Sequence, residues 1–272
     1  VSSSGCRLVC TAGRRCRARH VGWRLPGRER FARAARRSPV HTVLLMRHGE
    51  STWNTEDRVQ GWAPTPLTDR GVRQARDVGA LVAERFDVDR VVASDLRRTR
   101  ETTVQALDAA GLAIEPEYGS RFRERAMGTL QGLTVEQVYG DNPEYSLRDS
   151  GIHGARACPP GGESFLDMRE RVLDGWAELV ATTDSRTTMV VTHGGPIFAI
   201  LAHLWERSVV ASLEDGWASN GSIVEISIQE GRAAIRETDI RPADPAPRAS
   251  NEASGDPAGT AEPAEDSGET GP

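Results

Sequence analysis

Apolar and polar residues recur along the chain with two different periods, and each period predicts one kind of element. Short apolar runs bounded by turn residues predict strands at 42–47, 90–94, 113–117, 188–193, 222–228 and 232–238. Apolar residues spaced three or four apart predict helices at 69–85, 96–109, 134–139, 163–182 and 196–206. Because strands and helices alternate, an α/β fold with mostly parallel pairing is expected.

Residues at the ends of these elements refine the picture. Thr68 is expected to cap the first helix and Ser94 the second, since both carry a hydroxyl before a helical pattern. Pro196 suits the first position of the last helix. The final two strands meet around Glu230 and Gly231, which predicts a hairpin and therefore an antiparallel edge.

Charge divides the 272 residues into three parts. Residues 1–40 hold eleven arginines and one acid, a net charge of +10, and residues 241–272 hold seven acids and two arginines, a net charge of −5. The middle, 41–240, carries −10 and is long enough for one domain with a buried core. The last part is rich in Pro, Ala, Gly and acids, so we expect a disordered tail.

The arginine-rich N-terminal part has no apolar stretch long enough for a secretory core or a membrane span. The spacing of Cys6, Cys10, Cys16 and His20 matches no common zinc pattern, so no metal is expected there. A transit peptide or a nucleic-acid arm would have this composition, but a disordered extension is preferred and nucleic acid is not an expected partner. Cys158 alone in the middle part favours a reducing cytoplasm.

An arginine and a histidine stand side by side where the first predicted strand ends. The apolar run 42–46 leads into Arg47 and His48, and Gly49 opens a polar loop. A neutral imidazole is a competent nucleophile, and much of a histidine is neutral at pH 7. A guanidinium beside it can hold a phosphate through two parallel hydrogen bonds. The pair therefore indicates phosphoryl transfer, provided that partners occur elsewhere.

Two further strand ends carry residues that suit a phosphate. Arg98 lies in the first turn of a predicted helix, where a cation opposes the helix dipole unless an anion is bound. A solvated basic helix face would show the same sequence. His193 ends another strand, and Gly194 and Gly195 after it let the backbone approach a ligand closely. The repeated order of strand, histidine and glycine favours a shared site.

One carboxylate among arginines is the candidate acid–base group. Glu124 is flanked by Arg123 and Arg125, and a surface ion-pair cluster is the alternative interpretation. A general acid must be protonated when it acts, which neighbouring arginines oppose. If this segment ran as a strand, alternation would direct both arginines to the face opposite Glu124.

Five motifs occur in a fixed order: RHGESTWN, S-x-L-x-R-T-x-x-T, E-x-x-x-G-x-L-Q-G, PGGES and VTHGG. Together they resemble the histidine phosphatase superfamily, in its phosphoglycerate-mutase-like branch, over residues 41–238. The resemblance implies a three-layer α/β/α fold with a mostly parallel central sheet, and neither a metal nor an organic cofactor. It also implies that the Pro- and Gly-rich segment 140–162 is a mobile cap that decides substrate specificity.

The resemblance implies roles for particular residues. His48 would form a phosphohistidine through one ring nitrogen while the other bonds to backbone, and neighbouring guanidinium groups would lower its pKa. Arg47, Arg98 and His193 would surround the phosphate, and Glu124 would protonate the leaving oxygen and then activate water. Further contacts to the phosphate, the substrate or the pocket wall would come from Asn54, Gln60, Gly61, Gly194 and Ser164.

Within this family the sequence favours a hydrolase over a mutase. Mutases of this type carry a tyrosine where this chain has Met127, and they are rich in lysine, which this chain lacks. The expected function is metal-independent hydrolysis of a small phosphorylated metabolite, with phosphoglycerate mutase as the alternative. A nucleic-acid-binding protein with a vestigial pocket is the third hypothesis. The sequence indicates neither the substrate nor the oligomeric state.

Overall fold

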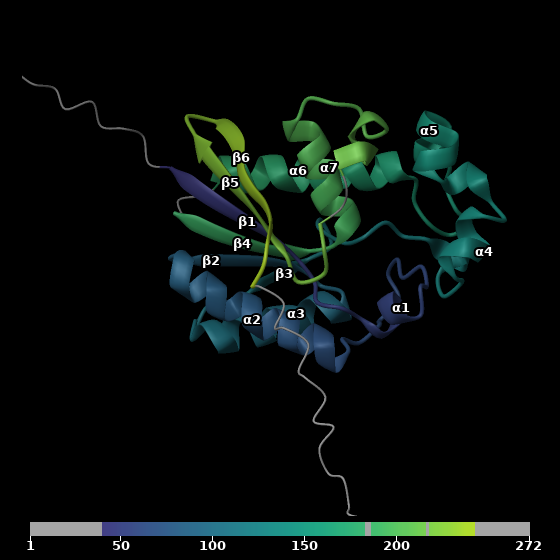
Figure 1. Cartoon of the computed structure of the whole chain (residues 1–272). Helices are drawn as coiled ribbons and strands as arrows, with labels where there is room; N and C mark the ends of the chain where they lie inside the picture. The colour runs from purple at the N-terminus through teal and green to yellow at the C-terminus, as the bar shows by residue number, and fades with distance from the viewer. Residues whose placement is uncertain (1–39, 183–185, 216–217, 243–272) are drawn as a thin grey trace, which may run out of the picture. The chain divides into compact units, whose positions relative to one another are not determined.

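The computed structural model describes residues 40–182, 186–215 and 218–242, and their centre is a six-stranded sheet (Figure 1). The strand order is β3-β2-β4-β1-β5-β6. These strands are β1 (His41–Arg47), β2 (Arg90–Ser94), β3 (Glu117–Gly119), β4 (Thr187–Thr192), β5 (Ile223–Gln229) and β6 (Arg232–Ile240). The first four run parallel, and β5 and β6 run antiparallel at one side. The predicted α/β fold with an antiparallel edge is confirmed.

Helices cover both faces of this sheet (Figure 1). In strand β1, whose residues 43–46 are buried, Val43 and Leu45 join one apolar cluster with α6 (Phe165–Thr182) and α7 (Gly194–Leu204). Leu44 and Met46 join another with α2 (Asp69–Arg85) and α3 (Arg97–Ala110). Successive strand residues point to opposite faces, so this alternation builds the three layers.

The pairing of strands brings three chain segments to one edge of the sheet. In the register of β1 and β4, Arg47 lies opposite Thr192, and the N–H of His48 donates to Thr192 O (3.0 Å). β2 pairs with the other side of β4 and ends at Ser94. The residues that follow these strands, His48 and His193 among them, therefore leave the sheet side by side, as carboxyl ends of parallel strands do.

One predicted element needs correction, and one segment contains elements that were not predicted. The strand expected at 113–117 is wrong: β3 begins only at Glu117, where pairing with Val92 starts. Ile114 is apolar because it packs on a core cluster from a loop, and Pro116 has no N–H to donate to a ladder. No helix or strand was predicted within the cap segment 140–162. It contains the 3-10 turn η2 (Pro143–Tyr145) and the helix α5 (Leu147–Arg156).

The remaining elements are short and lie mainly beyond the strand ends. They are α1 (Thr52–Thr55), η1 (Gly128–Leu130), α4 (Val135–Tyr139) and η3 (Ala211–Asp215). The described helices include none long and apolar enough to cross a membrane. The predictions made for residues 1–39 and 243–272 lie outside the described residues.

Three residues were predicted to mark the start of a helix, and the structure confirms one of these positions. The Thr68 hydroxyl accepts the Gly71 N–H (3.0 Å) at the start of α2, as predicted. The predicted cap at Ser94 is wrong, because α3 begins after Leu96. Pro196 is the third residue of α7 and not the first, since Gly194 and the residue after it already belong to the helix. A proline fits there because the first-turn N–H groups have no helical partner.

Candidate active site

His48 lies directly after β1 and is 3% exposed. Its Nδ1 is 2.7 Å from the carbonyl oxygen of Gly49. A carbonyl only accepts, so Nδ1 carries the proton and Nε2 of the neutral ring keeps its lone pair. Arg98 Nε donates toward this Nε2 at 3.3 Å. The ring is therefore held with its free nitrogen among cations, as a phosphate acceptor requires.

Two guanidinium groups, a buried one (Arg98) and a partly buried one (Arg47), lie beside His48. Arg98, in the first turn of α3, is 1% exposed and donates to the carbonyls of Gly61 (2.9 Å) and Ala63 (3.3 Å). Arg47 donates to Ala218 O (2.6 Å), and its Nε is buried with no partner within the described residues. Burial lowers the pKa of Arg98 to about 10, so both groups stay cationic at neutral pH. The Glu124 carboxylate attracts both guanidinium groups but pairs with neither, and cations removed from water without an ion-pair partner favour a bound anion.

His193 stands between the end of β4 and the start of α7, fully buried. Its ring lies edge-on to that of His48, with centroids 5.2 Å apart. Its Nε2 lies 2.8 Å from the hydroxyl oxygen of Ser94. The Ser94 hydroxyl therefore binds His193 and does not cap α3. Nδ1 is buried, and the described part of the chain offers it no hydrogen bond.

Both histidines are held in the neutral form. Burial is the main cause that lowers the pKa of His48 well below its usual value, followed by Arg98 and then Arg47. Burial likewise lowers the pKa of His193, followed by Arg98 and His48. The prediction that guanidinium groups lower the pKa of His48 therefore has the correct sign, but desolvation is the larger cause.

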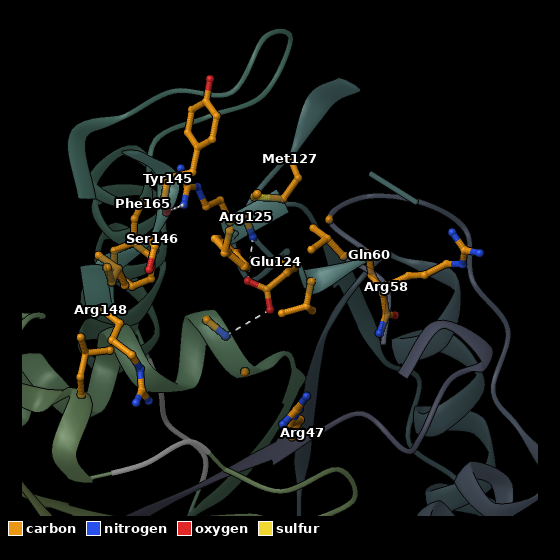
Figure 2. Close-up of a pocket in the computed structure, with 18 of the residues that line it drawn as sticks. Arg47, Arg58, Gln60, Glu124, Arg125, Met127, Tyr145, Ser146, Arg148 and Phe165 are labelled. Atoms are coloured by element: carbon orange, nitrogen blue, oxygen red, sulfur yellow. Dashed lines mark hydrogen bonds between the residues drawn. The ribbon is translucent and has the colours of Figure 1, made fainter. Parts of the chain in front are cut away.

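The Glu124 carboxylate faces this cluster across the pocket (Figure 2). Its Oε1 accepts the N–H of Arg125 (2.8 Å), and its Oε2 accepts the N–H of Gly195 (3.1 Å) at the N-terminus of α7. A Cβ atom at Gly195 would lie 2.2 Å from Oε1 of Glu124. A side chain at position 195 would therefore displace the end of the Glu124 carboxylate.

The arginines beside Glu124 do not follow strand alternation, because their segment is not a strand. Arg123 turns away and forms two 2.6 Å hydrogen bonds with Asp95. Arg125 lines the pocket, contrary to the prediction. Its guanidinium is occupied by backbone carbonyls, with the shortest contact at Ala157 (2.7 Å). Neither guanidinium therefore forms an ion pair with the Glu124 carboxylate in the structure.

These groups surround a pocket of about 420 Å³. One side is formed by Gln60 and Arg58, and the other by Tyr145, Ser146 and Arg148 of the cap (Figure 2). The predicted residues that line it are Arg47, His48, Gln60, Gly61, Arg98, Glu124 and Gly194. Its volume admits a phosphate ester with a small organic group.

The match to a family model agrees with this geometry. Residues 43–240 match the model of the histidine phosphatase superfamily (branch 1). The chain belongs to this superfamily. The resemblance stated from the five motifs is thereby confirmed.

Relatives within the superfamily carry phosphatase and mutase names. A metal-independent phosphoserine phosphatase of Arabidopsis thaliana is 31% identical, over 65% of this chain and 74% of the relative. A probable phosphoglycerate mutase of Yersinia pestis is 32% identical, over 67% of this chain and 90% of the relative. A mycobacterial glucosyl-3-phosphoglycerate phosphatase has a TM-score of 0.63 and 30% identity, over 73% of this chain and 98% of that one. This superfamily member is therefore a phosphatase or a mutase.

Three predicted site residues of this histidine phosphatase superfamily member, His193, Ser164 and Asn54, do not line the pocket. His193 instead contacts Ser94 and the ring of His48. The Ser164 hydroxyl bonds to Asp167 Oδ2 (2.7 Å) and accepts the Asp167 N–H (3.1 Å), so it holds the first turn of α6. Asn54 Oδ1 accepts from Ser51 N (3.0 Å) and lies 3.4 Å from Asn220 Nδ2. Asn54 therefore acts on the loop after His48 and does not face the pocket.

Some residues at the site were missed from the sequence. Asn220 Nδ2 donates to the backbone oxygen of His48 (3.1 Å), and Tyr145, Ser146 and Arg148 form the cap side of the pocket. None belongs to one of the five motifs, so no sequence signal pointed to them. Only the expectation that the segment 140–162 covers the pocket located the last three.

Proposed function

We propose that this protein hydrolyses a small phosphorylated metabolite without a metal, through a phosphohistidine formed on His48. The observation that carries the proposal is the buried neutral imidazole whose Nε2 lies 3.3 Å from Arg98, beside two guanidinium groups, Arg47 and Arg98, that form no salt bridge within the described residues. A dianionic phosphate would pair with both guanidinium groups. Its oxygens would receive donors from Arg47, Arg98 and His193, which stabilise the charge of the transition state.

In the first step, the lone pair of His48 Nε2 attacks phosphorus and the ester P–O bond breaks. The electron pair of that bond goes to the leaving oxygen, which takes a proton from the Glu124 carboxyl group. The Nδ1–H bond to Gly49 O keeps the ring in the tautomer that attacks.

In the second step, water attacks the phosphohistidine. The Glu124 carboxylate takes the proton from that water, the new P–O bond forms, and the P–N bond returns its electron pair to His48. The carboxyl group is then protonated again for the next cycle. The same carboxylate serves both steps because the leaving oxygen and the water occupy the same side of phosphorus.

Trapping the intermediate tests this proposal directly. Incubation with ³²P-labelled substrate followed by rapid alkaline quench should leave acid-labile label on the wild type, and His48→Ala should carry none. Turnover of 4-nitrophenyl phosphate should persist in EDTA. Absence of a labelled enzyme during rapid turnover, or loss of activity in EDTA, would contradict the proposal.

Phosphoglycerate mutase is the second candidate, because several relatives carry that name. Met127 lines the pocket with an apolar side chain and has no group to donate to a substrate carboxylate, which favours hydrolysis. The two functions differ in the fate of the phosphoryl group. Interconversion of 2- and 3-phosphoglycerate that is faster than phosphate release would select the mutase.

A further inference from the structure

The segment that carries Glu124 has no regular secondary structure to hold it. It leaves β3 at Gly119 and reaches η1 only at Gly128. Within it, the Phe122 carbonyl accepts a hydrogen bond from the Thr192 hydroxyl (2.7 Å). A reacting carboxylate on such a segment depends on further contacts, because a displacement of about 1 Å can cost roughly 100-fold in rate.

The guanidinium of Arg171, on α6, binds the backbone of this segment. Its Nη1 donates to the carbonyl oxygens of Ser120 (2.9 Å), Arg121 (2.8 Å) and Arg123 (3.2 Å). Its Nη2 donates to the carbonyl oxygen of Glu124 itself at 3.3 Å. The Arg171 side chain therefore connects four backbone carbonyls of this segment to helix α6.

Glu163 extends this contact from the loop before α6. Its Oε1 accepts from Arg171 Nη2 (2.6 Å) and from the N–H of Ala126 (3.0 Å). Its own N–H donates to Ala126 O at 2.9 Å. The side chains of Arg171 and Glu163 are 21% and 18% exposed, so water competes little for these bonds. The backbone is held on both sides of Glu124.

We propose that Arg171 and Glu163 are positioning residues for the Glu124 carboxylate. They fix the chain before and after Glu124, while the N–H of Gly195 binds the carboxylate itself. The inference rests on the proposed role of Glu124 as acid and base. It also assigns a role to Glu163, the glutamate of the PGGES motif, which is not among the groups proposed to bind the phosphate.

The dependence of rate on the leaving group tests this role. During transfer to His48, the leaving oxygen needs the proton of Glu124 most when the alcohol is a poor leaving group. Phenyl and benzyl phosphate carry poor leaving groups, whereas 4-nitrophenyl phosphate carries a good one. kcat/KM for these three esters reports the steps up to release of the alcohol or phenol and excludes hydrolysis of the phosphoenzyme.

Arg171→Met should lower kcat/KM for phenyl and benzyl phosphate about tenfold more than for 4-nitrophenyl phosphate, since a general acid contributes roughly 10²–10⁴-fold. Arg121→Met is the matched control. The Arg121 side chain comes from the same segment but pairs with Glu178 at the surface, where the two are 54% and 55% exposed. This control should leave the ratio between substrates unchanged. Glu163→Gln keeps an acceptor for the backbone N–H and should give an intermediate ratio.

A double substitution separates positioning from general loss of structure. In the Glu124→Gln background, Arg171→Met should change the ratio no further, because the proton donor is already absent. An equal loss for all three esters, or the same extra change of ratio in both backgrounds, would overturn the positioning role. Should Arg171→Met not fold, Glu163→Gln carries the same comparison. If Glu124→Gln matches the wild type on phenyl phosphate, the proposed acid itself is wrong and this inference falls with it.

Discussion

At the residue scale, the site combines two neutral histidines with two guanidinium cations. Removing water from His48 and His193 disfavours their protonated forms, and the nearby Arg98 adds to the same effect. The guanidinium groups stay charged despite burial because their intrinsic pKa is so high. Burial thus leaves the imidazoles neutral and the guanidinium groups charged, as the proposed nucleophile and the proposed phosphate binders require. The molecule holds this arrangement at a cost to its stability in acid.

That cost predicts how stability depends on pH. The unfolded chain protonates these histidines below about pH 6.5, while the folded protein does not, so the free energy of unfolding should fall as pH drops below 6.5. At pH 5.5 each histidine should cost about 1.4 kcal/mol relative to pH 7.5. Urea unfolding at the two pH values measures this difference. His193→Gln should remove about half of it, and an unchanged pH dependence in that variant would contradict the prediction.

Gly195 offers a second prediction at this scale. In Gly195→Ala the new methyl group would meet the Glu124 carboxylate, whose flexible end must move. We expect about a 100-fold loss in kcat with unchanged or higher thermal stability, because alanine favours a helix over glycine by about 1 kcal/mol. Gly119→Ala, where a Cβ meets nothing within 4 Å, is the control and should keep full activity. Equal activity in the two variants would contradict the prediction.

At the element scale, strand ends set the site and irregular segments complete it. The sequence predicted the strands that deliver Arg47, His48 and His193, because buried parallel strands are continuous apolar runs that stop abruptly. It did not predict α5, since Gly151 breaks the helical periodicity with φ 55 and ψ −127. Nor did it predict the Arg171 contacts, which join segments about fifty residues apart. Local patterns therefore located the residues at the strand ends. They did not locate the helix of the cap or the contacts of Arg171.

The cap predicts a preference among substrates. Arg148, at the start of α5, lines the pocket, and no hydrogen bond or ion pair is recorded for its side chain among the described residues. It should favour esters with a second negative group, such as 3-phosphoglycerate over glycerol 3-phosphate. Because Arg148 is exposed, Arg148→Gln should raise KM for 3-phosphoglycerate only about two- to fivefold. Arg156→Gln, at the other end of α5, is the control. An equal change in KM for both esters would contradict the prediction.

At the scale of the whole molecule, the charges are separated along the chain. The middle part, residues 41–240, carries −10 and encloses a cationic pocket, while residues 1–40 carry +10. Every residue that lines the pocket falls in the middle part, as does the family match. The groups proposed to bind a small anionic ester therefore all lie there. A polyanion would instead be attracted to the arginine-rich part.

Removal of residues 1–39 should separate these two properties. The shortened chain keeps His41, where β1 begins, and its net charge becomes −15. We expect kcat/KM for 4-nitrophenyl phosphate to stay within about twofold, because the shortened chain keeps every residue that lines the pocket and salt screens the removed charges. Retention on a heparin column at low salt should be lost, because the removed part holds eleven arginines. His48→Ala in the shortened chain should be inactive. If deletion abolished hydrolysis while the fold persisted by circular dichroism, the catalytic unit would have to extend into the arginine-rich part.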